Sequence, residues 1–140
     1  MIESTPKRRI VSFDVDATSY ESATQQIVAW AKENASRSVC LANVHMVMEA
    51  VDDPSFRAMI QKADLVTPDG MPLVWGLKLL GIEQAQRVYG PTLTLHVCGA
   101  AARQNIPIAL YGGAPDVVED CGLGGRVYRS HLWFLRLIVL

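Results

Sequence analysis

Short apolar runs alternate along the chain with stretches in which apolar residues recur at helical spacing. The runs predict strands at residues 10–15, 38–42, 64–67 and 106–111. The helical spacing predicts helices at 20–31, 44–51, 54–60, 73–80 and 91–101. Strands that alternate with helices favour an α/β fold, here a Rossmann-like parallel sheet with helices on both faces that is incomplete at the C-terminus.

Several residues predict where these helices begin and end. Thr18 and Glu21 form a capping-box pattern at the start of the first helix. Asp53 before Pro54 is typical of an N-cap followed by a first-turn proline. Gly81 lies where a glycine commonly ends a helix. The helix at 54–60 is expected to turn three side chains inward, namely Phe56, Met59 and Ile60.

The composition describes a small globular protein. With 140 residues, 50% of them hydrophobic and 19% charged, the chain can bury one core. The formal charge of -1 provides no broad attraction to nucleic acid, so we expect no nucleic-acid partner.

The cysteines and the N-terminus predict a reducing compartment. Cys40, Cys98 and Cys121 are an odd number without metal-type spacing, which favours buried free thiols. No apolar core of a signal peptide follows the basic N-terminal residues. No segment approaches the ~20 apolar residues that span a bilayer. We therefore expect a cytoplasmic protein.

The pattern changes after Asp120, which divides the chain into an α/β domain at 1–120 and a divergent tail at 121–140. The tail ends in a dense apolar stretch at 131–140, and it also carries Arg126, Arg129 and Arg136. It fits a final strand, an amphipathic segment on a membrane, or foreign sequence after a truncation or frame change. We favour the last interpretation.

Polar residues gather at three predicted strand ends, which is where parallel α/β sheets bind ligands. The three clusters are Asn43 with His45, Asp69 with Gly70, and Tyr111 with Gly112 and Gly113. Their coincidence with strand ends suggests a binding site.

Asp69 is the sharpest candidate for chemistry, because a Pro-Asp-Gly turn after a buried strand holds a carboxylate at a rigid edge. Gly70 keeps the approach open, so this carboxylate could accept a proton from a substrate hydroxyl. The same pattern also fits an ordinary turn in which Asp69 caps the next helix. Both interpretations stay open from the residues alone.

Other candidates have equally plain alternatives. The Arg87 guanidinium could bind a diphosphate through paired hydrogen bonds. The alternative interpretation is that Arg87 is an ordinary surface residue. Gly112 and Gly113 would let a backbone approach a phosphate, although no G-x-G-x-x-G fingerprint is present. His45 fits either substrate binding or a structural role. No histidine or carboxylate pair has convincing metal-ligand spacing, and we expect neither metal nor cofactor.

Four segments together resemble the WecG/TagA/CpsF glycosyltransferases in order and spacing. They read Ala-Asn-Val-His-Met-Val-Met-Glu-Ala at 42–50, Asp-Leu-Val-Thr-Pro-Asp-Gly-Met-Pro-Leu at 64–73, Arg-Val-Tyr-Gly-Pro at 87–91 and Tyr-Gly-Gly-Ala-Pro at 111–115. The resemblance extends from about Ile10 to about Glu119.

The resemblance implies an inverting, metal-independent enzyme of bacterial surface-polysaccharide synthesis. It would transfer N-acetylmannosamine, its uronic acid or a glucuronic-acid-type sugar from a UDP donor to an undecaprenyl-diphosphate-linked saccharide. By the same resemblance Asp69 corresponds to the catalytic base, Arg87 to the arginine that serves the diphosphate, and Asn43 to the asparagine of the donor pocket. Gly90 falls in the Arg87 segment and is expected at the same substrate site. Such an enzyme would contact the inner face of the cell membrane peripherally.

The chain departs from the family in two places. Leu41 stands where many relatives have threonine, which removes one hydroxyl contact to the donor. The family's C-terminal half is not recognisable after Asp120, so we expect a poor or inactive catalyst, and an apolar sheet edge that favours self-association.

Two other functions are consistent with parts of this pattern. One is an inactive fragment that binds nucleotide-sugar or serves as an interaction domain. The other is a Rossmann-type oxidoreductase, against which the missing glycine fingerprint and the missing acidic residue about 20 positions later both count.

Overall fold

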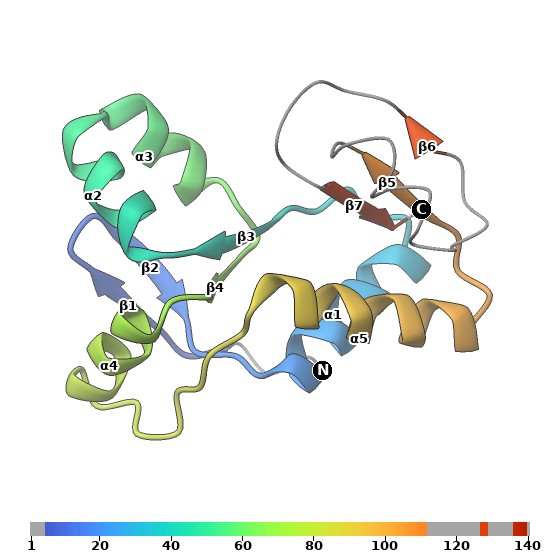
Figure 1. The fold of residues 1–140 in the computed structure, drawn as a ribbon, viewed down its shortest axis with the longest axis horizontal. Coiled ribbons are helices and arrows are strands. Elements are labelled where there is room, and N and C mark those ends of the chain that lie inside the picture. Colours follow the sequence, from blue (N-terminus) through green and yellow to red (C-terminus); the bar gives the residue numbers. More distant parts are fainter. Residues whose placement is uncertain (1–4, 112–126, 129–135, 140) are drawn as a thin grey trace.

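The computed structural model describes residues 5–111, 127–128 and 136–139 (Figure 1). Strands and helices alternate along most of this part of the chain. In order they are β1 (Lys7–Ile10), β2 (Phe13–Asp16), α1 (Tyr20–Lys32), β3 (Val39–Ala42), α2 (Val44–Asp52), α3 (Pro54–Gln61), β4 (Leu65–Pro68), α4 (Met71–Leu79), α5 (Gly90–Arg103), β5 (Ile108–Tyr111), β6 (Val127–Tyr128) and β7 (Arg136–Val139).

The described strands form three small sheets. β1 and β2 make an antiparallel hairpin, and β3 pairs with β4 in parallel, with Val39 opposite Leu65 and Ala42 opposite Pro68. β5 pairs in parallel with β6 and antiparallel with β7. The α/β class is therefore confirmed. One parallel sheet with helices on both faces stays a prediction, because these pairings do not join the three sheets.

A buried carboxylate connects the hairpin to the parallel pair. β2 lies beside β4, and the Val66 amide donates a 2.8 Å hydrogen bond to Oδ2 of Asp16. Asp16 is only 6% exposed, and its burial raises the pKa of the carboxyl group, although the Val66 amide and Lys7 oppose the shift. Without this hydrogen bond the Val66 amide, on the edge of β4 that faces β2, would have no partner.

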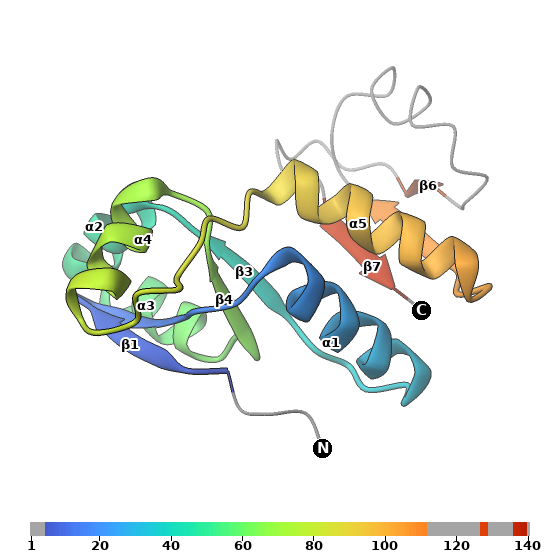
Figure 2. The same ribbon diagram turned by 90° about the horizontal axis from the view of Figure 1, so that it is seen from below.

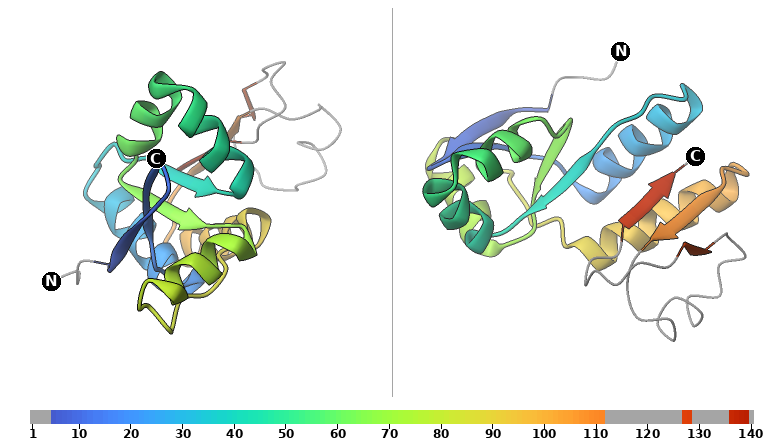
Figure 3. Two further views of the ribbon diagram at one scale, coloured as in Figure 1. Left: turned by 90° about the vertical axis from the view of Figure 1, so that its left-hand side faces the viewer. Right: turned by 90° about the horizontal axis from the view of Figure 1, so that it is seen from above.

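Helices cover β1 to β4 from several directions. Figure 3 shows the four strands between α2 and α3 on one side and α4 on the other. Phe13, Val15, Val66, Leu73 and Leu77 belong to the apolar core at this end. A second cluster packs α1 and α5 side by side, as Figure 2 shows. Among the described helices, none has both the length and the apolar character needed to cross a bilayer.

The helix ends follow the local sequence closely. Asp53 caps α3 as predicted, because its Oδ1 accepts from the amides of Ser55 and Phe56. Gly81 follows α4 with a φ of 92°, a conformation that favours glycine. The capping-box prediction at Thr18 was wrong by one residue, since Oγ of Ser19 accepts from the Ser22 amide and α1 begins at Tyr20.

Two further predictions were wrong. The run at 10–15 is not one strand, because the chain turns at Val11, whose φ is 56°, and the Ser12 amide donates to the Ile10 carbonyl at 2.7 Å. Met59 does not face the core and is 61% exposed, whereas Ile60 beside it is buried. Helical periodicity identifies an apolar side, but it does not show how far that side extends.

Candidate functional site

The carboxyl ends of β3 and β4 are held together by backbone hydrogen bonds. The amides of Asp69 and Gly70 both donate to the Ala42 carbonyl, at 2.9 and 3.3 Å. The Val88 amide donates to the Pro68 carbonyl at 2.9 Å, which brings the loop before α5 to the same edge. Two segments far apart in sequence therefore meet where the parallel strands end.

Asp69 faces Arg87 across this edge. Nη2 of Arg87 lies 3.5 Å from Oδ1 of Asp69, and Nε of Arg87 donates to the Asp69 carbonyl. The Asp69 side chain is 21% exposed. Its Oδ2 has no hydrogen-bond donor among the described residues. Gly70 is the N-cap of α4 and makes no side-chain capping bond, so the alternative in which Asp69 caps α4 is not what the structure shows.

Arg87 is held from a second side by an aromatic ring. Its guanidinium carbon lies 4.6 Å from the centre of the Tyr89 ring, within cation–π range. The Tyr89 amide donates to the Tyr20 hydroxyl at 3.0 Å, which anchors the loop to α1. The Arg87 side chain remains 45% exposed, so its outer face is open to a ligand.

Two glycines are packed closely against neighbouring residues at this edge. A Cβ on Gly90 would lie 2.9 Å from Cδ1 of Leu41 and 3.7 Å from Oδ2 of Asp69. A Cβ on Gly70 would lie 3.6 and 3.7 Å from Cα and Cβ of Asn43. The Gly90 position therefore has no room for a side chain while Leu41 keeps its place. Leu41 lies directly against this edge.

Asn43 has a structural role and remains near the site. Its Oδ1 accepts a 3.0 Å hydrogen bond from the Met46 amide and so caps α2. Its Nδ2 group has no partner in the part of the chain that the structure describes. Because Asn43 lies against Gly70, its free donor is close to the Asp69 turn.

No described contact links His45 or Tyr111 to Asp69. The His45 side chain is 87% exposed on α2, and its Nε2 lies 3.8 Å from Oε2 of Glu49. Tyr111 ends β5, which does not pair with β3 or β4. Gly112 and Gly113 lie outside the described residues.

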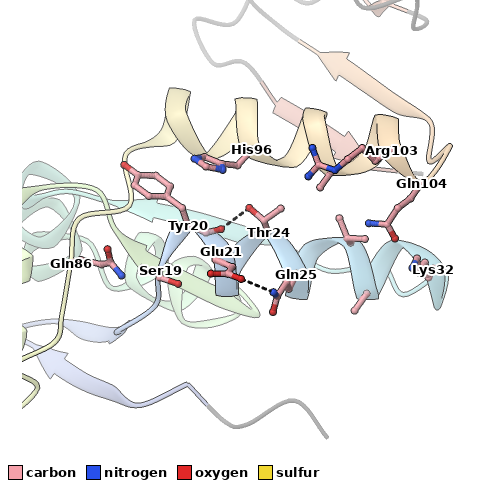
Figure 4. Close-up of a pocket in the computed structure, with 13 residues that line it drawn as sticks. Ser19, Tyr20, Glu21, Thr24, Gln25, Lys32, Gln86, His96, Arg103 and Gln104 are labelled. Atoms are coloured by element: carbon pink, nitrogen blue, oxygen red, sulfur yellow. Dashed lines mark hydrogen bonds between the residues drawn. The ribbon is translucent and has the colours of Figure 1, made fainter.

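A groove between α1 and α5 was not predicted from the sequence (Figure 4). Its walls carry Thr24, Gln25, Arg103 and Gln104, and at one end the Tyr20 and His96 rings stack with centroids 5.2 Å apart. Tyr20 thus contacts both the groove and the Tyr89 loop. Its position on the apolar side of a predicted helix gave no signal for this double role.

The thiol and metal predictions concern other parts of the fold. Burial raises the pKa of the Cys40 thiol in β3 to about 11, so this thiol is protonated at neutral pH and is a poor nucleophile. Cys121 lies outside the described residues. Over the described ranges, no group of three or more His, Cys, Asp or Glu side chains is placed to hold a metal ion.

The geometry is that of an α/β protein with a carboxylate and a guanidinium at the ends of parallel strands. The similarity of the chain to known proteins agrees with this class. The model of the glycosyl transferase WecG/TagA/CpsF family matches residues 8–123, and the chain belongs to that family. A curated relative from Bacillus spizizenii, an N-acetylglucosaminyldiphosphoundecaprenol N-acetyl-beta-D-mannosaminyltransferase, is 24% identical over 119 residues. The match covers 85% of this chain and 46% of that protein, so the chain spans about half the length of this relative.

Proposed function

We propose that the chain carries the base and the diphosphate-binding arginine of a glycosyltransferase. The donor would be a UDP-linked N-acetylmannosamine, its uronic acid or a glucuronic-acid-type sugar, and the acceptor an undecaprenyl-diphosphate-linked saccharide. Membership of the family and the printed activity of the relative support this assignment. The observation that carries it is the meeting of Asp69 and Arg87 at the carboxyl ends of β3 and β4.

Asp69 is proposed to act as the general base. The oxygen of the acceptor hydroxyl forms a bond to the anomeric carbon, the bond from that carbon to the UDP oxygen breaks, and the hydroxyl proton passes to Asp69. One such displacement inverts the anomeric centre. Oδ2 of Asp69 has no donor among the described residues, and the Asp69 side chain is 21% exposed, which supports the approach of a hydroxyl to this oxygen. A positioned base of this kind contributes about 10²–10⁴ in rate.

Arg87 is proposed to stabilise the leaving UDP. Negative charge grows on the diphosphate as the sugar departs, so a guanidinium there binds the transition state more strongly than the donor. The contacts of Arg87 with Asp69 and Tyr89 hold the side chain, while its exposed part meets the diphosphate. Asn43 would contribute its free Nδ2 group to the donor pocket, without a metal ion in the reaction.

The proposal is tested by transfer of radiolabelled sugar from UDP-N-acetylmannosamine and UDP-glucuronic acid to lipid-diphosphate acceptors. The full chain is compared with Asp69→Asn and with Asp52→Asn, a matched change at an exposed aspartate at the end of α2. Transfer that is lost only in Asp69→Asn supports the proposed base. Equal transfer by all three proteins would refute it.

A second candidate is a nucleotide-sugar-binding fragment without turnover. The specific observation in its favour is that the chain spans about half the length of the relative. Calorimetric titration with UDP and the transfer assay together distinguish the two candidates. Both would bind UDP and lose that binding in Arg87→Ala, but only the enzyme would show transfer. We also propose peripheral contact with the inner membrane face, because the acceptor is lipid-linked. Self-association of the chain is a separate part of the proposal.

A further inference from the structure

Helix α4 is apolar on both sides, although only one side is covered. Its inward side is buried in the core through Leu73, Val74 and Leu77. Its outward side carries a stripe formed by Met71, Trp75 and Leu79, which are 40, 58 and 88% exposed. We call these three residues the α4 stripe. A helix that is apolar all round usually has a second apolar environment on its outer side.

Two cations without carboxylate partners border the α4 stripe. Lys78 is the single charged residue of α4 and is exposed. Arg8 lies on the neighbouring strand β1, where it donates to the carbonyls of Lys7 and Leu80 at 2.9 and 3.3 Å. Neither cation is paired with a carboxylate within the described ranges.

The other cations of β1 are already neutralised. Lys7 lies 3.9 Å from Oδ1 of Asp16, and Nε of Arg9 lies 3.1 Å from Oδ1 of Asp14. Arg8, which alternates with them along the strand, is therefore the cation that β1 presents on the α4 side. Apolar area and unpaired positive charge coincide on one surface.

The α4 stripe also begins beside the candidate site. Met71 follows the Asp69–Gly70 turn directly, so the first turn of α4 adjoins the base. An acceptor attached to a lipid must reach Asp69 while its hydrocarbon stays in a bilayer. A membrane-contact surface next to the turn would meet this requirement.

We propose that the α4 stripe, with Lys78 and Arg8, is a surface that rests on an anionic lipid bilayer. The apolar side chains would enter the boundary between headgroups and acyl chains, and the cations would pair with lipid phosphates. The choice of a lipid partner rests on the proposed function. The charge favours it over a second copy, which in a self-complementary interface would bring the same two cations toward their own equivalents.

Vesicle co-sedimentation of the full chain tests this surface. We expect binding to vesicles that contain phosphatidylglycerol and weaker binding to phosphatidylcholine alone. The double variant Trp75→Ser/Leu79→Ser should lower the partition coefficient by at least about tenfold, because two exposed apolar contacts are lost. Leu95→Ser on α5, where Leu95 is 74% exposed, is the matched control and should bind like the parent.

Fluorescence reports the depth of the contact directly. The chain has three tryptophans, and changing Trp30 and Trp133 to phenylalanine leaves Trp75 as the only tryptophan. Emission should shift to shorter wavelength on vesicles and be quenched by brominated phosphatidylcholine. Co-sedimentation shows whether the chain binds the bilayer, and the fluorescence of Trp75 shows whether the α4 stripe enters it.

Two results would overturn the proposal. One is the absence of vesicle binding, which together with a dimer that dissociates only in the stripe variant would assign the surface to a second copy. The other is an equal loss of vesicle binding in Leu95→Ser and in the stripe variant. UDP titration of the same proteins keeps this outcome separate from the proposed function. Binding of UDP without binding of vesicles would refute only the membrane surface at the α4 stripe. Binding of vesicles without binding of UDP would refute only the donor site.

Discussion

An aspartate meets an arginine at each end of the β3–β4 pair, and the two pairs differ in how completely they are bonded. At the amino end, Oδ1 of Asp64 lies 2.8 Å from Nη1 of Arg37, and its Oδ2 accepts from the Ser38 amide at 2.8 Å. At the carboxyl end, Oδ1 of Asp69 lies 3.5 Å from Nη2 of Arg87. Oδ2 of Asp69 has no donor among the described residues.

The comparison separates a structural ion pair from one that we propose to be functional, although both are made of the same residue types. The bonds of Asp64 tie the entry to β3 to the entry to β4. Burial disfavours the charged form of Asp64, but the Ser38 amide and Arg37 outweigh it and lower the pKa of the carboxyl group. In Asp69 one carboxylate oxygen has no donor among the described residues, and the Arg87 side chain remains 45% exposed, which leaves both free for the proposed roles.

Asp69→Asn should have the largest effect of any single change. The amide cannot accept the hydroxyl proton, so transfer should fall by about 10²–10⁴ if the chain turns over. The melting temperature should stay close to that of the parent, because Asp69 caps no helix. A large loss of stability would place Asp69 in the same structural class as Asp64.

Arg87→Lys should come next. Lysine keeps the charge but loses the forked donor and the planar contact with Tyr89, so UDP affinity should fall by roughly 10- to 100-fold in calorimetry. Arg103→Lys in the α1–α5 groove is the control and should leave UDP affinity unchanged. Equal losses in both variants would place the nucleotide in the groove.

Asp64→Asn should affect stability and leave the donor site alone. It weakens the bonds to Ser38 and Arg37, and we expect a loss of about 1 kcal/mol, or roughly 2–5 °C in melting temperature. UDP affinity should be that of the parent, since Asp64 lies at the far end of the strands. A change in UDP affinity would break the proposed separation of the two ends.

The pH dependence of this difference has a definite sign. The pKa of Asp64 is lowered in the folded state, so its stabilisation is present above the ordinary value of 3.8 and is lost as pH falls through the folded pKa. The melting-temperature difference between parent and Asp64→Asn should therefore be full at pH 7 and shrink below pH 3.8. Asp16, whose raised pKa acts with the opposite sign, is present in both proteins and cancels.

Tyr20→Phe should have the smallest effect and sharpens the description of the Arg87 loop. The variant leaves the Tyr89 amide without its partner but keeps the ring on His96. We expect a loss of about 0.5–1 kcal/mol in thermal unfolding and a small decrease in UDP affinity. An unchanged melting temperature would show that the hydroxyl does not hold the loop.

Local signals predicted the parts of the fold that depend on neighbouring residues. The Asp53-Pro54 start of α3, the glycine after α4 and the β3 and β4 runs are all of this kind. The turn at Val11 escaped prediction because no glycine, proline or asparagine marks it. The extent of the apolar side of α3 at Met59 depends on what packs there, which periodicity does not report.

The candidate site could likewise be predicted where it depends on neighbouring residues, and not where it depends on contacts between distant segments. The Asp69 turn could be predicted from a strand followed by Pro-Asp-Gly, but its partner Arg87 comes from a loop 18 residues later, and only the family resemblance placed the two together. The contact between Tyr20 and Tyr89 spans 69 residues and has no sequence signal. The functional roles of all the candidate residues, Asp69 and Arg87 included, stay predictions.

The central claim is that the nucleotide binds at the carboxyl end of β3 and β4, and an NMR titration of the ¹⁵N-labelled full chain with UDP tests it most directly. We predict that the largest shifts fall on the amides of Asn43, Gly70, Val88 and Gly90, with the amides of Ser38 and Asp64 unmoved. Shifts confined to Thr24, Gln25 and Arg103 in the α1–α5 groove, or no shifts at all, would contradict the account.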